Sequence, residues 1–443
     1  MLSQMRNISL VFILIILFSC KQHTTQYTNV FNDPLFYSRT VKELNNVVLQ
    51  NNFPPIIASR NYLYANIAAY EVMVLGDPRF ISLAGRVRDL TAVPRQDTAH
   101  VNLNYAALLS FCKAGESVTF PAGSMKVYLD ELDSVATSCG MSEEMKKATR
   151  QLADSVAGHI LQWSKKDHYA QTRTAERYSI TNEPGRWVPT PPAYMQALEP
   201  HWREIRTLVM DSANQFMPPR PPAFDITNKE SKFYTEVMAV KNTGDSLSDE
   251  QKHIAEFWDD LGNRTVSQGH VMFTAKKFSP PGHWMNIVGI AAKQAKADFS
   301  TTVYAYTKTV IAMFDAFIQC WDEKYRSNVI RPETVINKYI DQKWRPYLQT
   351  PPFPEYTCGH STVSASAAEV LTDIFGDHFA YTDSSELEFG IKNRSFTSFR
   401  QAAVENNWAR FYGGIHFHNS CLISNEYGKK VGDLVNEKLR IKK

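Results

Sequence analysis

Apolar residues at helical spacing, followed by a lysine and an arginine, constrain this chain more than any other stretch. Between residues 303 and 321, apolar side chains recur at steps of three and four, which is the period of an amphipathic helix. Lys324 continues that face, and Arg331 lies seven residues later, about two turns further along if the helix persists. Pro332 disfavours helical geometry in the residue before it, so Arg331 is predicted to mark the exit of this helix. The stripe consists of Val303, Tyr306, Val310, Met313, Phe314, Phe317 and Trp321.

A second stretch combines a proline-rich segment with a short Cys-Gly-His motif. Neighbouring prolines hold Phe353 in an extended, non-helical conformation. Cys358, Gly359 and His360 follow, and residues 361–375 are rich in Ser and Ala, which predicts a closely packed helix. Backbone N–H groups at the start of such a helix point toward an anion, and a glycine there lets a ligand come close.

A third motif lies near the end of the chain, where Arg410 precedes His416 and two glycines stand between them. Taken alone, each motif has an ordinary explanation. A basic pair is usually a solvated face, a Gly-His pair a turn, and a single histidine a hydrogen-bonded core residue. Taken together, Lys324, Arg331 and Arg410 add three permanent cations to two histidines. Such a set is what a tetrahedral oxyanion such as phosphate or vanadate needs.

In order and spacing, these motifs resemble the signature of a superfamily that joins vanadium-dependent haloperoxidases with phosphatases of the phosphatidic-acid-phosphatase type. The pattern is Lys, six residues, Arg-Pro; then Ser-Gly-His; then Arg, five residues, His. It covers the second half of the chain. An upstream run at 280–284, Pro-Pro-Gly-His-Trp, is similar to bacterial haloperoxidases, and most to the iodoperoxidases of marine flavobacteria. Trp321 and Phe353 stand where some haloperoxidases carry aromatic residues. The residues that match the shared signature are Lys324, Arg331, Gly359, His360, Arg410 and His416.

The resemblance implies a vanadium-dependent haloperoxidase that binds vanadate, with His416 as the one protein ligand of the metal. Hydrogen peroxide and iodide would be its substrates, and the resulting hypoiodous-acid equivalent would iodinate small organic acceptors. His360 would move protons and Lys324 would polarise the peroxide, while Trp321 and Phe353 would form the halide pocket. The residues implied in cofactor binding are Lys324, Arg331, Cys358, Gly359, His360, Arg410 and His416.

Other functions stay open. A bromoperoxidase of the same family would use the same residues. A secreted acid phosphatase would use His416 as its nucleophile and His360 to protonate the leaving group. A lipoprotein that only binds oxyanions would leave His360 unexplained. The upstream motif, the two aromatic residues and the lack of a long apolar segment after the N-terminal one favour the haloperoxidase.

Two positions depart from the superfamily pattern. Cys358 replaces the usual serine, and a thiol is a weaker donor than a hydroxyl. We expect it to stay a protonated thiol, because a thiolate would repel vanadate and be open to oxidation. Ser420 stands where many phosphatases carry an aspartate and is a poor substitute for a carboxylate, although a backbone carbonyl could orient the imidazole of His416.

Residues 1–20 are typical of a lipoprotein signal peptide, because a basic residue precedes an apolar run too short to span a bilayer. The end of that run, Leu-Phe-Ser-Cys, resembles a bacterial lipobox, which predicts lipidation of Cys20; ordinary secretory cleavage is the alternative. Residues 21–34 are predicted as a polar tether. We therefore expect an exported protein, in the periplasm or at the outer surface, held at the membrane only through a lipid anchor.

The remaining residues, 35–443, are predicted to form one all-α unit of two helix bundles packed together, as the resemblance also implies. No alternating strand pattern is evident. The N-terminal helical half extends to about residue 224, and the catalytic half covers 225–443. The proline-rich stretch 173–224 joins the halves or forms a rim of the active site. A net charge of +3 without a basic tract argues against nucleic acid as a partner.

Overall fold

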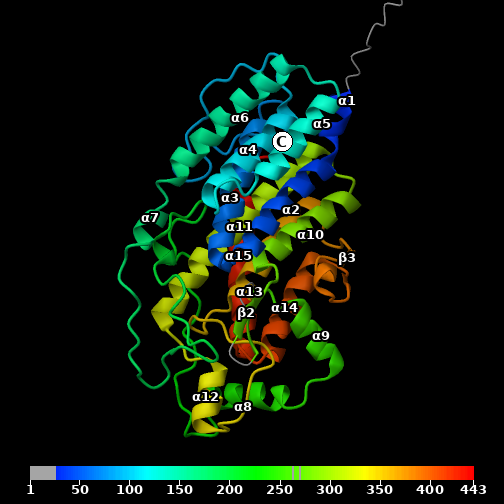
Figure 1. The fold of residues 1–443 in the computed structure, drawn as a ribbon. Coiled ribbons are helices and arrows are strands. Elements are labelled where there is room, and N and C mark those ends of the chain that lie inside the picture. The colour runs from blue at the N-terminus through cyan, green and yellow to red at the C-terminus, as the bar shows by residue number, and fades with distance from the viewer. Residues whose placement is uncertain (1–25, 262–263, 269–270) are drawn as a thin grey trace, which may run out of the picture.

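The protein is described by a computed structural model that covers residues 26–261, 264–268 and 271–443 (Figure 1). Its architecture is mostly helical, as predicted, and the helices pack into one body. The helices are α1 (Gln26–Asn32), α2 (Pro34–Gln50), α3 (Pro55–Met73), α4 (Leu103–Val118), α5 (Lys126–Ser138), α6 (Glu143–Ser164), α7 (Tyr169–Thr172), the 3-10 helix η1 (Trp202–Glu204), α8 (Lys232–Gly244), α9 (Asp249–Phe257), α10 (Pro280–Gln294), α11 (Phe299–Ser327), α12 (Pro332–Tyr339), α13 (Gly359–Phe375), the 3-10 helix η2 (Leu387–Phe389), α14 (Phe399–Tyr412) and α15 (His418–Lys438).

Two short antiparallel hairpins accompany the helices, and the sequence did not predict them. Strand β1 (Arg264–Gln268) pairs with β2 (Val271–Ala275), and β3 (Tyr381–Asp383) pairs with β4 (Arg394–Phe396). Strands of three to five residues are too short to show a clear alternation of apolar and polar side chains.

Helix α11 lies at the centre of the fold. Its N-terminus is capped by Asp298, whose side chain accepts a hydrogen bond from the backbone N–H of Thr301. Residues 302–324 are buried without interruption, although the apolar stripe alone would have buried only one face. The helix packs against α2 and α3 from the first half of the chain and against α13 and α15 from the second. The two halves therefore share one core, with α11 between them.

The exit of α11 differs from the prediction. The helix ends at Ser327, where Asn328 adopts a left-handed conformation with φ 49° and donates its backbone N–H to the carbonyl of Lys324. Arg331 is extended and precedes α12, in which Pro332 occupies the first position. Proline suits that position because it needs no N–H there, so this proline begins a helix instead of ending one. Lys324 and Arg331 thus come from different elements.

The described chain begins inside the predicted tether, and its first residues differ from that prediction. Residues 26–32 form α1 and not an extended tether, because Phe31 is buried and its ring stacks on Tyr105 at a centroid distance of 4.6 Å. Asp33 then caps α2 by accepting a hydrogen bond from the N–H of Leu35. The predicted signal peptide, Cys20 and residues 21–25 lie outside the described part of the chain.

The proline-rich stretch 173–224 contains little regular structure and packs against the loop before α13. The carbonyl of Leu198 accepts hydrogen bonds from Trp321 Nε1 at 3.2 Å and from Tyr325 Oη at 2.6 Å. Tyr356 Oη donates to the carbonyl of Pro219 at 2.6 Å. The sequence left open whether this stretch joins the two halves or forms a rim of the active site. These contacts place it against the loop and the helix that carry predicted site residues.

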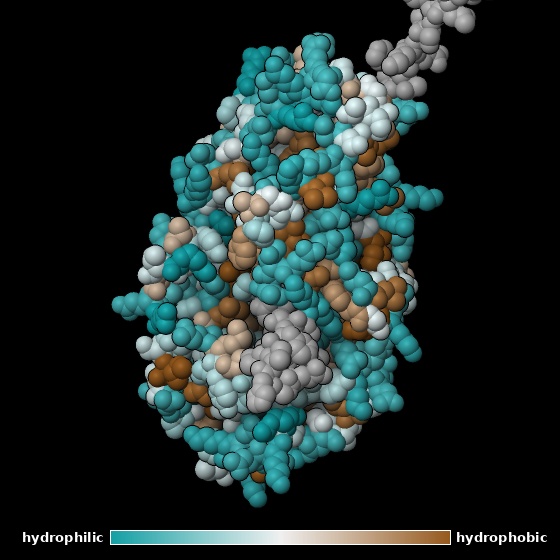
Figure 2. All heavy atoms as spheres, in the orientation of Figure 1, coloured by the Kyte–Doolittle hydropathy of each residue, from teal (hydrophilic) through white to brown (hydrophobic). Residues whose placement is uncertain are grey.

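The molecular surface is largely hydrophilic on the face drawn in Figure 2, where hydrophobic residues form separate small groups. Within the described ranges, no helix is both long and apolar enough to cross a membrane.

Candidate active site

The guanidinium of Arg331 brings the three predicted motifs together. Its Nε donates to the carbonyl of Phe353 at 2.9 Å, which ties it to the proline-rich loop. Its Nη1 donates to the carbonyl of Ile415 at 2.7 Å and lies 3.0 Å from His416 Nε2. The side chain is fully buried. Arg331, which is predicted to bind an anion, therefore also connects the proline-rich loop to the segment before His416.

Lys324 holds the same loop from the other direction. Its Nζ donates to the carbonyls of Pro354 at 2.9 Å and Glu355 at 3.0 Å, and also to that of Thr357. Burial lowers the pKa of Lys324 to about 8. All three ammonium protons are engaged by the backbone, so the contribution of Lys324 to an anion in this geometry is its charge and not a direct hydrogen bond.

A carboxylate that the sequence analysis missed orients His416. Glu355 Oε1 lies 2.7 Å from His416 Nδ1 and also accepts the backbone N–H of Phe417 at 3.2 Å. Nδ1 is therefore the protonated nitrogen, and the Nε2 lone pair faces the guanidinium of Arg331. Ser420 plays no such part, because its buried hydroxyl has no partner in the described structure. A carboxylate, and not a backbone carbonyl, therefore orients His416.

His360 and Arg410 complete the polar set. Arg410, at the end of α14, donates from Nη1 to the carbonyl of Trp258 at 2.9 Å. His360 is the second residue of α13 and is 8 % exposed. Burial, reinforced by the charge of Arg410, lowers the pKa of His360 well below its usual value. The imidazole is therefore neutral and able to accept a proton.

The predicted aromatic pair also meets at this place. The rings of Trp321 and Phe353 lie 5.0 Å apart, and Lys324 Nζ lies 4.9 Å from the Phe353 ring centroid. Gly359 begins α13 directly against Trp321, since a Cβ added to this glycine would lie 3.4 Å from that indole. The two aromatic rings therefore lie side by side, and their role as a halide pocket stays a prediction.

Cys358 differs from the expectation of a protonated thiol. Burial alone would raise the pKa of this thiol, but a hydrogen bond from the Cys421 thiol, followed by the interaction with His416, holds it well below the usual value. Its backbone N–H donates to Ser424 Oγ at 2.7 Å and is not free for a ligand. The partner thiol lies far along the sequence, on α15, where no motif marked it.

The pocket has more positive charge than its own residues balance. Three buried cations converge here, and the groups that can carry negative charge beside them among the described residues are the Glu355 carboxylate and the Cys358 thiol. Burial lowers the pKa of Arg331 to about 10, because no anion in the pocket fully compensates for the water that its charge has lost. Several buried polar atoms lack a hydrogen-bond partner within the described residues: Arg331 Nη2, Arg410 Nε, His360 Nε2, Ser361 Oγ and Ser420 Oγ. Donors left over around excess positive charge fit a tetrahedral oxyanion.

Comparison with known proteins also indicates a pocket for a tetrahedral oxyanion. A family model described as the second helical-bundle domain of VCPO matches residues 305–441. A solved structure described as the first bacterial vanadium-dependent iodoperoxidase is 42 % identical in sequence, with a TM-score of 0.86, and the alignment covers 92 % of this chain and 97 % of that one. The chain belongs to the bacterial vanadium-dependent haloperoxidases. No curated protein matches it.

More distant structures share the fold of this haloperoxidase. The holo form of a bacterial vanadium-dependent chloroperoxidase is 17 % identical with a TM-score of 0.65, over 87 % of this chain and 92 % of that one. The apo form gives 17 % and 0.64, over 87 % and 94 %. As a member of its family, the haloperoxidase uses vanadate as its cofactor, and the charge and donors of the pocket fit that anion.

Proposed function

We propose that this haloperoxidase is an iodoperoxidase. It would oxidise iodide with hydrogen peroxide to a hypoiodous-acid equivalent, which then iodinates small organic acceptors. Support comes from the 42 % identity, over nearly the whole chain, to a protein described as an iodoperoxidase. The observation that carries the proposal is the buried pocket, in which Arg331 lies 3.0 Å from His416 Nε2 and Arg331 and Arg410 each keep an unpaired donor.

In this proposal, His416 Nε2 is the protein ligand of the vanadium. Glu355 keeps the proton on Nδ1, so the lone pair of Nε2 stays available. The unpaired donors of Arg331, Arg410 and Ser361 would hold the oxygens of the cofactor. When bound, vanadate supplies a Lewis acid that activates peroxide without a change in the metal's oxidation state.

His360 moves the protons that this chemistry requires. Its Nε2 is unpaired and its ring is neutral, so it can accept a proton from incoming peroxide and return it later. Lys324 adds positive charge from behind the loop that it fixes.

Trp321 and Phe353 form the wall on which halide selectivity would depend. Their rings are almost buried, with Phe353 7 % exposed, and they present apolar surface beside the ammonium of Lys324. Such a surface suits a large, polarisable and weakly hydrated anion. Iodide is also more easily oxidised than bromide, so bromide oxidation requires a more strongly activated peroxide at the same site.

One observation favours phosphate-ester hydrolysis as a second candidate. A nucleophilic imidazole needs an acceptor that fixes its tautomer, and Glu355 supplies that acceptor at 2.7 Å. His360 would then protonate the leaving group. Vanadate and phosphate compete for one pocket in both cases, so the two functions are separated by turnover and not by binding.

The test is a paired assay of vanadium-free and vanadate-reconstituted protein with iodide, bromide and a phosphate ester. We expect peroxide-dependent iodide oxidation only after vanadate is added, little bromide oxidation, and loss of reconstitution when phosphate is present in excess. Full iodide oxidation by vanadium-free protein would overturn the proposal. Phosphate-ester turnover without halide oxidation would replace it by the second candidate.

A further inference from the structure

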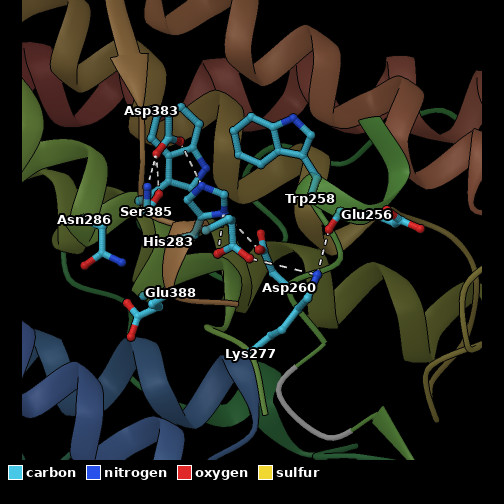
Figure 3. Close-up of polar contacts among 12 residues, drawn as sticks. Glu256, Trp258, Asp260, Lys277, His283, Asn286, Asp383, Ser385 and Glu388 are labelled. Carbon is cyan, nitrogen blue, oxygen red and sulfur yellow. Dashed lines mark hydrogen bonds and ion pairs between the residues drawn. The ribbon is translucent and has the colours of Figure 1, made fainter. Parts of the chain in front are cut away.

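A second buried polar cluster lies outside the vanadate pocket, around the histidine of the upstream Pro-Pro-Gly-His-Trp motif. His283, in the first turn of α10, is fully buried between two carboxylates (Figure 3). Its Nδ1 lies 2.9 Å from Asp260 Oδ1, and its Nε2 lies 2.9 Å from Asp383 Oδ2. The proposed reaction uses none of these residues.

A third carboxylate faces this cluster without a hydrogen bond. Glu386 is fully buried, and neither of its oxygens has a hydrogen-bond partner in the described part of the molecule. The nearest cationic atoms are His283 Nδ1 at 3.9 Å and Lys277 Nζ at 4.0 Å. Lys277 is already engaged, because it donates to the carbonyl of Glu256 at 2.7 Å. Asp260 Oδ2 is also buried and unpaired.

The unpaired atoms lie on one side of the imidazole. Asp383, on the other side, is satisfied, since its Oδ1 accepts the backbone N–H of Ser385 at 2.9 Å and its Oδ2 faces His283. A buried carboxylate that accepts no hydrogen bond, and whose cationic neighbours stand 3.9 and 4.0 Å away, is costly, so further positive charge is favoured at this position.

We propose that Asp260, His283 and Glu386 form a binding site for a divalent transition-metal ion. One oxygen from each carboxylate and Nδ1 of the imidazole lie within 4.8 Å of one another. Metal–ligand bonds of about 2.0–2.2 Å place such donors roughly 3–4 Å apart, which the site reaches with small side-chain shifts. The ion would take the place of the proton that His283 Nδ1 now shares with Asp260.

The surroundings of His283 support this assignment. Histidines that bind metals usually donate their other ring N–H to a carboxylate, and here Asp383 accepts from Nε2. Two carboxylates with one imidazole suit Zn²⁺ or Mn²⁺ better than Ca²⁺ or Mg²⁺, which prefer oxygen ligands alone.

The site would also support the vanadate pocket from behind. Trp258 stacks on His283 with ring centroids 4.7 Å apart, and its carbonyl accepts the hydrogen bond from Arg410 Nη1. Trp284, the next residue, donates to Ser364 Oγ on α13 at 2.8 Å. A bound ion would therefore fix the elements that position two sides of the pocket, whichever reaction the pocket performs.

The experiment measures metal content and thermal stability of full-length, vanadate-loaded protein that has been purified without chelators. Glu386→Gln removes one ligand and keeps the shape of the side chain. Glu388→Gln is the matched control, because Glu388 is two residues away, exposed, and paired with Lys42 at 2.6 Å. Asp383→Asn is a milder variant that keeps all three ligands and weakens only the support of His283.

We expect about one Zn²⁺ or Mn²⁺ per chain in the wild type and in Glu388→Gln, and none in Glu386→Gln after the same dialysis. A chelator should lower the Tm of the wild type and of the control but leave that of Glu386→Gln unchanged. Asp383→Asn should bind Mn²⁺ about 10–100-fold more weakly, measured by titration.

Two results would overturn the proposal. The first is wild-type protein without a divalent ion whose Tm does not respond to added Zn²⁺ or Mn²⁺. The second is equal metal content in the wild type and Glu386→Gln. If the cluster is neutralised by protons alone, Glu386→Gln should raise Tm, because it removes an unpaired buried carboxyl, and no variant should respond to metal.

Discussion

At the scale of single residues, the hydrogen bond between His416 and Glu355 decides which ring nitrogen faces the pocket. Because Nδ1 donates to Glu355 at 2.7 Å, Nε2 keeps its lone pair and points to Arg331. Glu355 is itself fixed, since its backbone N–H donates to the carbonyl of Val329 at 2.9 Å and its carbonyl accepts from Lys324. A rigid carboxylate of this kind raises the basicity of the ligand it orients.

The first prediction separates the ligand from the residue that orients it. His416→Ala should retain no vanadium after dialysis, because no other imidazole occupies that place. Glu355→Gln should keep the site but weaken vanadate binding about 10–100-fold, since the amide orients the ring with less charge. Metal analysis and vanadate titration give both values.

Glu333→Gln is the control for this pair, because Glu333 is also buried, and its carboxylate accepts from Thr350 instead of His416. Equal vanadium content in the wild type and His416→Ala would show that the ligand assignment is wrong.

The second prediction concerns the pH dependence of kcat/KM, which we expect to follow the protonation of His360. Its pKa is lowered by burial and by Arg410, so the neutral form that accepts a proton persists below the ordinary histidine pKa of about 6.5. As the pH falls through the lowered pKa, the ring becomes protonated and activity is lost. The acid limb of kcat/KM should therefore lie below pH 6.5.

His360→Ala should lower kcat by about 10²–10⁴-fold and abolish this limb, while vanadium content is retained. A limb above pH 7 that survives in His360→Ala would assign the titration to another group.

Cys358 predicts sensitivity to oxidation. Its lowered pKa favours the thiolate, which peroxide attacks. Incubation with peroxide and no halide should inactivate the wild type, and a thiol reductant should restore it. Cys358→Ser should resist this loss and keep iodide turnover, because it replaces a thiolate that repels vanadate by a neutral hydroxyl that can donate a hydrogen bond.

Cys112→Ala is the matched control, because Cys112 is buried too but its pKa is raised by burial. If Cys358→Ser abolished turnover, sulfur would take part in the reaction and the roles proposed above would fail.

The sequence predicted the residues of the pocket but not the contacts that tune them. The order of the motifs marked Arg331, His360 and His416 because their spacing is fixed by the elements that carry them. Glu355 and Cys421 lie in no motif, and each reaches its partner only through the tertiary fold. A single sequence carries no signal for such long-range pairs.

At the scale of elements, the pocket depends on the close packing of α13 and α15. A Cβ added to Gly428 on α15 would lie 2.1 Å from the carbonyl oxygen of Thr362 on α13. The two helices therefore touch through their backbones just behind the start of α13, where His360 is placed. Small residues along α13 are what this contact needs, and the sequence indicated it.

The packing prediction concerns Gly428→Ala. The added methyl group must push α13 away, so we expect a loss of about 1–3 kcal/mol or more in the free energy of unfolding, together with weaker vanadate retention. Gly158→Ala on α6 is the control, because a Cβ there meets nothing within 4 Å. It should gain about 0.5–1 kcal/mol from helix propensity. Urea unfolding measures both, and equal stability of the two variants would contradict the close contact.

The sequence predicted α11 from its apolar period and α13 from its small residues, because both signals are local. The errors came where one residue has two meanings. A proline disfavours helix in the residue before it, which predicts that a helix ends at Arg331. A proline also suits the first position of a helix, and in the structure Pro332 begins α12. The two hairpins were missed because their pairing depends on neighbours and not on a pattern within the strands.

At the scale of the whole molecule, α11 makes the two predicted halves into one core. Its burial on all sides could not be predicted from a stripe of apolar residues on one face, since partners from both halves cover it. The start of the described chain is similar: α1 was expected to be part of a tether because it is polar, yet its Phe31 docks on Tyr105. In Figure 1, α1 lies at one end of the molecule and α12, which follows Arg331, at the other.

This placement gives the last prediction, which concerns the lipid anchor at Cys20. The lipobox-like sequence predicts a diacylated cysteine a few residues before α1, and an anchor at that end would direct the vanadate pocket away from the membrane. Cys20→Ala should therefore move the protein from the membrane fraction to the soluble fraction, while iodide turnover per vanadium stays that of the wild type in detergent. Labelling with a radioactive fatty acid should mark the wild type and not the variant. Ser19→Ala serves as the control, because a small residue beside the cysteine should still permit processing. If Cys20→Ala remained in the membrane fraction after a high-salt wash, the chain would be held there by something other than a lipid on Cys20.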